Sequence, residues 1–495
     1  MSRHNGGRVL AIGLDAAEPK LIRRLIEQDE MPVLKALLAE GRWMPVHSPA
    51  HIGSGAIWPT FLTGKEPPEH GIYGEWCWQP ETMSLFRFDG RNLKPFWKTL
   101  SEKGISVGVL DPPFARFVGL SEGFEIIDWG AHDSLEGRVH AGPKEIADFL
   151  AGQPESHPFS SARPYNASAD DSRELGKLTS QCLKGVKLRG GLALALLTRA
   201  RPDFAFIVFP EIHHSAHHLW PPLGFDPVDA EGVKPMLKEI CREVDRQIGI
   251  LIEAAGSGRT VLVFSLHGMR PTAGVAAFLQ PLLCEKGFAR LADWKTQSWA
   301  ERAHSFIAAA KRHTPEALKK VYYNALTPNA TRYLARPTML PPYDWARTRA
   351  FSLPSDQHGW IRINLQGRER AGIVSPEHYD DTCRQLEELM RSLCGEDGRS
   401  LVRQVIRTAA NSEKARSSKL PDLVVHWADS AFAPSSGIQG SAVKIQTICK
   451  KFTGQHAIGG FCILSGGSDL DYTGDLLAKD MHLLIAGLLG LPRLA

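Results

Sequence analysis

The chain has 495 residues, of which 43% are apolar, so it can bury a large core in one domain with insertions or in two or three domains. Its 58 basic and 54 acidic residues give a formal charge of +4 with no long run of either sign, which argues against a nucleic-acid polymer or a membrane surface as partner. The eight cysteines include no Cys-x-x-Cys pair, and the chain has neither an apolar signal segment nor an apolar run of membrane length, so we expect a cytoplasmic protein with reduced thiols.

The first predicted strand is the apolar run 9–14, and Asp15 follows it directly. Residues 21–26 carry apolar side chains at helical spacing, so we expect a helix to come next. An aspartate between a buried strand and a helix is either a hard oxygen ligand for a metal ion or the N-cap of that helix. The local sequence leaves both roles open.

Ser54 is the candidate nucleophile. It lies in a turn of small residues, Gly53-Ser54-Gly55, ahead of an apolar run that is compatible with a helix. Backbone amides at a helix N-terminus favour an anion, which suits a serine that attacks phosphorus or sulfur. A plain helix-capping serine is the alternative.

The next segments are a strand and a long region of different character. Residues 107–110 predict another buried strand. Residues 131–200 have less strand character and a polar centre, so we interpret them as an insertion or cap.

Four histidines follow the next predicted strand, the apolar run 204–209. If the chain becomes helical here, His213 and His217 share one helix face, as do His214 and His218, and either pair can bind one metal ion. The alternatives are a solvated polar loop and core histidines with satisfied hydrogen bonds.

A third candidate ligand follows a third strand. Residues 237–255 predict a helix, and residues 261–264 predict a buried strand that ends shortly before His267. Asp15, the histidine cluster and His267 thus each come after a predicted strand. Because open α/β sheets carry their chemistry at the carboxyl ends of the strands, one metal site on a shared edge is the simplest explanation.

The rest of the chain contains one more candidate, His456, in a glycine-flanked loop ahead of an apolar strand. Residues 280–347 are rich in basic side chains, and we interpret them as a solvated helical insertion, with a clamp for an anionic substrate as the alternative. The other predicted elements are strands at 360–364 and 423–425 and a helix at 379–393.

Seven motifs bear on the family. They are the Gly-Leu-Asp15 opening, Trp58 to Gly64 with Pro67 to Ile72, His213-x-x-x-His217-x-x-Trp220, Ser265-x-His267-Gly-Met269, Asp344 to Ala350, Asn364 to Glu369 with Gly372-Ile-Val374, and Gly454-x-His456. In this order they resemble the alkaline-phosphatase superfamily, and specifically its type I phosphodiesterase/nucleotide pyrophosphatase branch. The resemblance implies an α/β fold with a largely parallel central sheet and helices on both faces. It also implies a single catalytic domain over residues 1–495, with helical insertions at about 131–200 and 280–347.

The resemblance further implies a centre of two metal ions. Asp15, the nucleophile Ser54 and His267 would bind one ion. His213, His217 and His456 would bind the other. Trp220, three residues after the ligand position, selects His217 over His218. Zinc is the expected ion, in one or two copies, with manganese or iron as alternatives.

The chain departs from the family pattern at three positions. Leu266 stands where an aspartate usually precedes the His267 position, His213 replaces an aspartate ligand, and Glu75 replaces an asparagine that contacts phosphate. Because the centre loses carboxylates, we expect Glu211, on the same sheet edge, to bind a metal ion or to hydrogen-bond a metal-bound water.

The expected function is hydrolysis of a phosphodiester or pyrophosphate bond in a small, anionic, intracellular ester through a covalent seryl intermediate. Two alternatives follow from the same residues. One is a phosphoryl or sulfuryl transferase on the same scaffold, and the other is a metal-binding homologue without catalytic activity. The sequence does not identify the leaving group or the oligomeric state.

Overall fold

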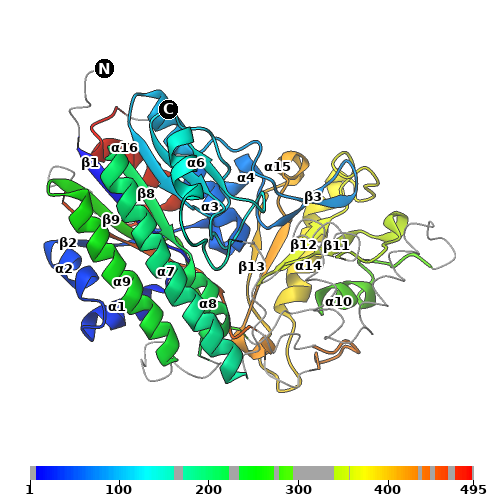
Figure 1. Cartoon of the computed structure of the whole chain (residues 1–495). Coiled ribbons are helices and arrows are strands. Elements are labelled where there is room, and N and C mark those ends of the chain that lie inside the picture. Colours follow the sequence, from blue (N-terminus) through cyan, green and yellow to red (C-terminus); the bar gives the residue numbers. More distant parts are fainter. Residues whose placement is uncertain are drawn as a thin grey trace.

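The computed structural model of the chain describes residues 7–160, 171–221, 234–272, 278–293, 339–355, 357–432, 437–445, 452–466 and 474–492. Within these ranges, no helix combines the length and the apolar character that a membrane crossing needs. Two sheets of unequal size organise this part of the chain (Figure 1).

The larger sheet has nine strands and a parallel centre. β9, β1, β8, β5 and β6 run parallel to one another, as expected for apolar runs that are buried on both faces. β16 runs antiparallel between β9 and β2, β17 pairs parallel with β2, and β7 forms an antiparallel edge next to β6. In spatial order the strands are β17 (Leu476–Leu477), β2 (Gly41–His47), β16 (Gly460–Ser465), β9 (Arg259–Ser265), β1 (Arg8–Leu14), β8 (Phe204–Phe209), β5 (Val107–Leu110), β6 (Gly123–Ile127) and β7 (His140–Gly142).

Helices cover both faces of this sheet, because successive side chains of a strand point to opposite sides. In β1, Leu10 and Ile12 belong to one hydrophobic cluster, and Val9 and Ala11 belong to the other. The first cluster includes side chains of α1 (Pro19–Glu27), α2 (Pro32–Glu40), α6 (Lys144–Ala151), α7 (Ser172–Ala200), α8 (Glu211–Leu219) and α9 (Pro235–Ala255). The second includes side chains of α3 (Ile57–Thr63), α5 (Phe96–Glu102) and α16 (Met481–Leu488).

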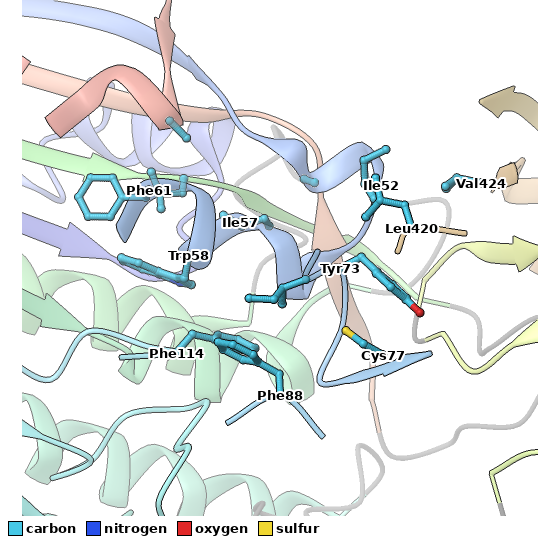
Figure 2. Packing of buried hydrophobic residues seen from close by; sticks show 14 of the residues in the cluster. Ile52, Ile57, Trp58, Phe61, Tyr73, Cys77, Phe88, Phe114, Leu420 and Val424 are labelled. Atoms are coloured by element: carbon cyan, nitrogen blue, oxygen red, sulfur yellow. The ribbon is translucent and has the colours of Figure 1, made fainter. Parts of the chain in front are cut away.

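A smaller antiparallel sheet, yellow to orange in Figure 1, lies beside the larger one. The second hydrophobic cluster runs without interruption from the large sheet into this smaller sheet. Figure 2 shows part of it, from Phe61 and Trp58 to Leu420 and Val424. The two sheets therefore share one core. The smaller sheet and its helices are β11 (Ala350–Leu353), β12 (Gly359–Ile363), β14 (Leu423–Trp427), β13 (Val402–Arg407), α10 (Leu279–Glu285), α14 (Pro376–Arg391) and α15 (Ser412–Ser417).

Short elements connect these parts. Two antiparallel two-stranded sheets are the hairpin of β3 (Trp76–Gln79) with β4 (Ser84–Arg87), and the pair of β10 (Gly268–Pro271) with β15 (Gly454–Ala457), which are distant in sequence. The short helices are α4 (Pro67–His70) and the 3₁₀ turns η1 (Pro49–His51), η2 (Ser54–Ala56), η4 (Trp345–Arg347), η5 (Asp429–Phe432) and η6 (Ala478–Asp480).

The expected fold class is confirmed, with a mostly parallel central sheet between layers of helices. The apolar runs 9–14, 107–110, 204–209 and 261–264 lie in β1, β5, β8 and β9. The segment 131–200, interpreted above as an insertion or cap, contains α7, whose apolar side chains pack in the core with those of α9. It therefore forms part of a helical layer. Of the expected insertion 280–347, residues 294–338 lie outside the described residues, and the division into one domain with insertions stays a prediction.

Candidate metal centre and nucleophile

Three neighbouring strands bring the candidate residues to one edge of the large sheet. β1 lies between β8 and β9 and runs parallel to both. Asp15 follows β1, α8 begins after β8, and His267 follows β9. β10 continues from this point and pairs with β15, which sets Met269 opposite His456. Residues far apart in sequence thus meet where parallel strands end.

Four histidines converge at this edge. In α8, His213 and His217 are one turn apart, and their Nε2 atoms are 3.0 Å apart. His213 Nε2 also lies 2.7 Å from His456 Nε2. Ligand atoms of His213, His267 and His456 all lie within 4.8 Å of one another. The structure brings together the four histidines that the family resemblance gives as ligands, His213, His217, His267 and His456, and their role as ligands stays a prediction.

In His213 and His217 the second ring nitrogen, Nδ1, contacts an oxygen atom of the protein. His213 Nδ1 is 2.6 Å from Asp15 Oδ2, and His217 Nδ1 is 3.0 Å from the carbonyl oxygen of Gly454. Burial lowers the pKa of His213 and of His217 well below the usual value, and neighbouring histidines lower it further. Neutral imidazole is the form that binds a metal ion.

Asp15 is buried and uses both carboxylate oxygens. Trp58 Nε1 donates to Oδ1 at 3.0 Å, while Oδ2 contacts His213. Burial, followed by the charge of Asp133, raises the pKa of Asp15 to about 7. The first helix of the chain is capped by Glu18, so the N-cap alternative for Asp15 does not hold.

His132 is a member of the cluster that the sequence analysis missed. Its ring stacks on that of His213 with centroids 3.8 Å apart, and ligand atoms of His132, His213 and His217 lie within 4.8 Å of one another. Its Nδ1 is 3.3 Å from Asp133 Oδ1. The dipeptide His132-Asp133 matches no recognisable ligand motif, and it lies in the segment that the sequence analysis assigned to an insertion. The available signal was its place shortly after β6, another parallel strand of the same sheet.

Ser54 begins η2, which leads into α3, and it is partly buried. Its flanking glycines allow close packing. A Cβ on Gly53 would lie 2.2 Å from the carbonyl oxygen of Tyr73, and one on Gly55 would lie 2.5 Å from Cα of Gly74. Four residues after Ser54, Trp58 connects this segment to the metal-centre candidates through Asp15.

The smaller sheet holds the backbone just before Ser54. Three consecutive carbonyl oxygens each contact a ring nitrogen from the smaller sheet or its flanking loop. The pairs are Ala50 with His358 Nε2 at 3.0 Å, His51 with His426 Nε2 at 2.8 Å, and Ile52 with Trp360 Nε1 at 2.8 Å. These contacts join the turn that holds the candidate nucleophile to the core that both sheets share.

Glu211 does not belong to the histidine cluster. Its side chain is fully buried, and Oε1 lies 2.9 Å from both His157 Nε2 and Arg189 Nε. Arg189 also contacts Asp111 Oδ2 at 2.9 Å. Burial by itself raises the pKa of Glu211, but Arg189 and then His157 outweigh it and hold the pKa below its usual value.

The expectation that Glu211 binds the metal ion is therefore replaced by a structural role. Two residues along an α-helix turn a side chain by about 200°, so Glu211 and His213 point in different directions from α8. Glu211 faces Arg189 of α7, and His213 faces Asp15.

Besides His213, two residues depart from the family pattern, Leu266 and Glu75, and the structure shows which side chains surround each of them. Leu266 is buried among apolar side chains and offers no ligand atom. Glu75 forms an ion pair with Arg87, with 2.9 Å between Oε1 and Nε. Its negative charge is thus partly compensated by the neighbouring strand.

Comparisons with known proteins cover nearly the whole chain. A family model described as "Type I phosphodiesterase / nucleotide pyrophosphatase" matches residues 9–453. The phosphonoacetate hydrolase of Sinorhizobium meliloti 1021, solved with phosphonoacetate, has a similar fold, with a TM-score of 0.53, 16% identity, and coverage of 99% of this chain and 97% of that one. Murine ectonucleotide pyrophosphatase / phosphodiesterase 5, in complex with AMP, gives a TM-score of 0.45 at 13% identity, covering 99% and 96%. No curated protein sequence matches the chain.

Proposed function

We propose that this chain, which belongs to the type I phosphodiesterase / nucleotide pyrophosphatase family, is a metal-dependent hydrolase that cleaves a phosphodiester or pyrophosphate bond in a small anionic ester. The observation that carries the proposal is the close approach of two histidine nitrogens to Nε2 of His213 at the strand edge that also bears Asp15: Nε2 of His217 lies 3.0 Å away and Nε2 of His456 lies 2.7 Å away. Burial lowers the pKa of His213 and of His217 well below the usual value, which favours the neutral imidazole that a transition-metal ion binds. Zinc is the expected ion, with manganese or iron as alternatives.

Each group in the centre has a separate task in the proposed reaction. His213, His217 and His456 would hold the ion, which when bound supplies positive charge to the non-bridging oxygens of the attacked group. The Ser54 oxygen bonds to phosphorus while the bond from phosphorus to the leaving oxygen breaks, and the hydroxyl proton of Ser54 passes through solvent to the leaving oxygen. Water then hydrolyses the seryl ester and restores the Ser54 hydroxyl. The contacts to the carbonyls of residues 50–52 keep the Ser54 turn in place during both steps.

We also propose that the protein acts in the cytoplasm. The cysteines that the structure describes are free, and most of them are buried. A reducing compartment suits such thiols. The proposed substrate is accordingly a small intracellular ester.

The test is turnover by Ser54→Ala on a panel of phosphodiester, pyrophosphate, phosphomonoester and sulfate ester substrates. We expect Ser54→Ala to abolish turnover while the circular dichroism spectrum stays unchanged. Thr63→Ala is the matched control, because Thr63 ends α3, the helix that follows the Ser54 turn, and its hydroxyl donates to the backbone carbonyl of Pro59 and accepts from the backbone amide of Lys65.

Three results would contradict the proposal. Activity of Ser54→Ala close to that of the parent would exclude the seryl intermediate. Transfer to an added alcohol in preference to water would make the protein a transferase on this scaffold, and bound metal without turnover on any substrate would favour a non-catalytic homologue.

A further inference from the structure

The backbone just before His132 is held by the side chain of Asp111. Oδ1 of Asp111 accepts from the amide of Trp129 at 2.9 Å, and Oδ2 accepts from the amide of Gly130 at 2.7 Å. Asp111 directly follows β5 and is fully buried, whereas the two amides belong to the loop 128–137 that follows β6. One carboxylate thus fixes the first part of the loop that carries His132.

The backbone after His132 is held as well. Arg87 of β4 donates to the carbonyl oxygens of residues 134 and 135, at 2.8 and 3.1 Å. The carboxylate of Asp128 accepts from the amide of Glu136 at 2.9 Å. The loop 128–137 is therefore anchored on both sides of His132.

The carboxylate of Asp111 is also connected to α8, through Arg189 of α7. The guanidinium of Arg189 contacts Asp111 Oδ2 and Glu211 Oε1, both at 2.9 Å, and all three side chains are fully buried. Glu211 is the first residue of α8, the helix that carries His213. Asp111 therefore links the loop and the helix whose histidine rings stack on each other.

The backbone conformation of Asp111 supports a functional position. Its φ of 62° and the φ of 60° at Asp128 lie in the left-handed region, which residues other than glycine rarely adopt. Both aspartates directly follow parallel strands of the large sheet, as Asp15 does. Backbone strain of this kind gathers at active sites, where the surrounding fold holds a side chain in one place.

The orientation of the His213 ring depends on the loop 128–137. The ring of His132 lies against one face of His213, with centroids 3.8 Å apart and an interplanar angle of 19°. Packing that locks the rotamer of a site residue keeps the site in its working geometry. Displacement of the loop would remove this contact and free the His213 ring to turn.

We propose that Asp111 is a positioning residue of the candidate active site, which sets the loop that carries His132 against α8 and thereby holds the ring of His213 in place. Its effect on turnover rests on the proposed function, whereas its effect on the loop does not. This role differs from that of a purely structural ion pair, because the effect on turnover passes through His132.

The experiment is a double-mutant cycle of Asp111→Asn and His132→Ala in the purified full chain, with kcat and KM measured on an ester that the parent hydrolyses. Asparagine keeps one acceptor oxygen and tolerates the left-handed backbone. We expect Asp111→Asn to lower kcat about 10-fold to 100-fold with little change in KM. In the His132→Ala chain, the same substitution should change kcat by less than about 2-fold, because the residue through which Asp111 acts is already missing.

Asp245→Asn is the matched control. Asp245 is likewise buried and accepts from two backbone amides, those of Val33 and Leu34 in α2. This variant should lower the urea midpoint and leave kcat unchanged. Amide hydrogen exchange gives a readout that is independent of turnover: residues 128–137 should exchange faster in Asp111→Asn than in the parent or in Asp245→Asn.

Additive effects on kcat in the cycle would overturn the inference, because Asp111 would then act independently of His132. Unchanged exchange of residues 128–137 would overturn it as well. If Asp111→Asn does not fold, Asp128→Asn takes its place in both measurements, since Asp128 holds the same loop. A parent chain without turnover on any ester would reject the proposed function alone, and the exchange rates would then decide the inference.

Discussion

Replacing Glu211 by glutamine tests whether this carboxylate supports the fold or the metal centre. The side chains of Glu211, Arg189 and Asp111 are all 0% exposed, and each of the two carboxylates lies 2.9 Å from Arg189. Glu211→Gln removes one negative charge and leaves the guanidinium with Asp111 as its remaining ionised partner. Loss of one partner of a buried ion pair costs about 3–5 kcal/mol.

We expect a cost near the lower end of this range, about 3 kcal/mol, because the glutamine oxygen can keep the contacts of Oε1. The new amide group would take the place of Oε2, which accepts no hydrogen bond from the part of the chain that the structure describes. A loss of this size is a large part of the roughly 5–15 kcal/mol that separates folded from unfolded proteins. It should lower the urea midpoint clearly.

The assay compares urea midpoints and metal content for the parent, Glu211→Gln and a control, Glu253→Gln. Glu253 is exposed on α9, so the control should change stability by no more than about 0.5 kcal/mol. Folded Glu211→Gln should keep its metal, because Glu211 belongs to neither group of convergent ligand atoms among the described residues. A variant with the stability of the parent but without its metal would refute the structural role and restore Glu211 as a ligand.

Three further predictions concern the nucleophile turn and the smaller sheet. Trp360→Phe removes the donor to the carbonyl of Ile52 but keeps an aromatic ring. Steady-state kinetics should therefore show a lower kcat with little change in KM. An unchanged kcat would exclude a role of Trp360 in positioning the Ser54 turn. In Gly55→Ala the new Cβ would lie only 2.5 Å from Cα of Gly74, so the backbone there must move. Thermal denaturation should show a lower Tm, and an activity assay should show reduced turnover. Wild-type values for both would show that the turn is not tightly packed. Burial raises the pKa of Asp422, but Arg368 outweighs it and holds the pKa below the ordinary 3.8, so this pair stabilises the fold above about pH 4 and loses its effect as the pH falls further. Urea midpoints measured from pH 6 downward should therefore decrease more for the parent than for Asp422→Asn, and parallel curves would contradict that assignment.

The elements that carry the centre were predictable because they depend on local periodicity. The apolar runs 9–14, 204–209 and 261–264 are long enough and apolar enough to form buried strands, and they do so as β1, β8 and β9. A helix after β8 necessarily places His213 and His217 on one face, because 3.6 residues make one turn. Parallel strands then put Asp15 and His267 at the same edge.

The partners of single side chains were decided only by tertiary structure. The partner of each carboxylate depends on the helix that packs beside it. Asp15 accepts from Trp58 of α3, and Glu211 accepts from Arg189 of α7. His132 joins the cluster because the loop after β6 brings its ring against His213 of α8, and its place after a parallel strand indicates the sheet edge but not this contact. A sequence records periodicity over a few residues, whereas a contact across a sheet edge depends on how whole strands and helices pack, and that arrangement emerges only when the chain folds.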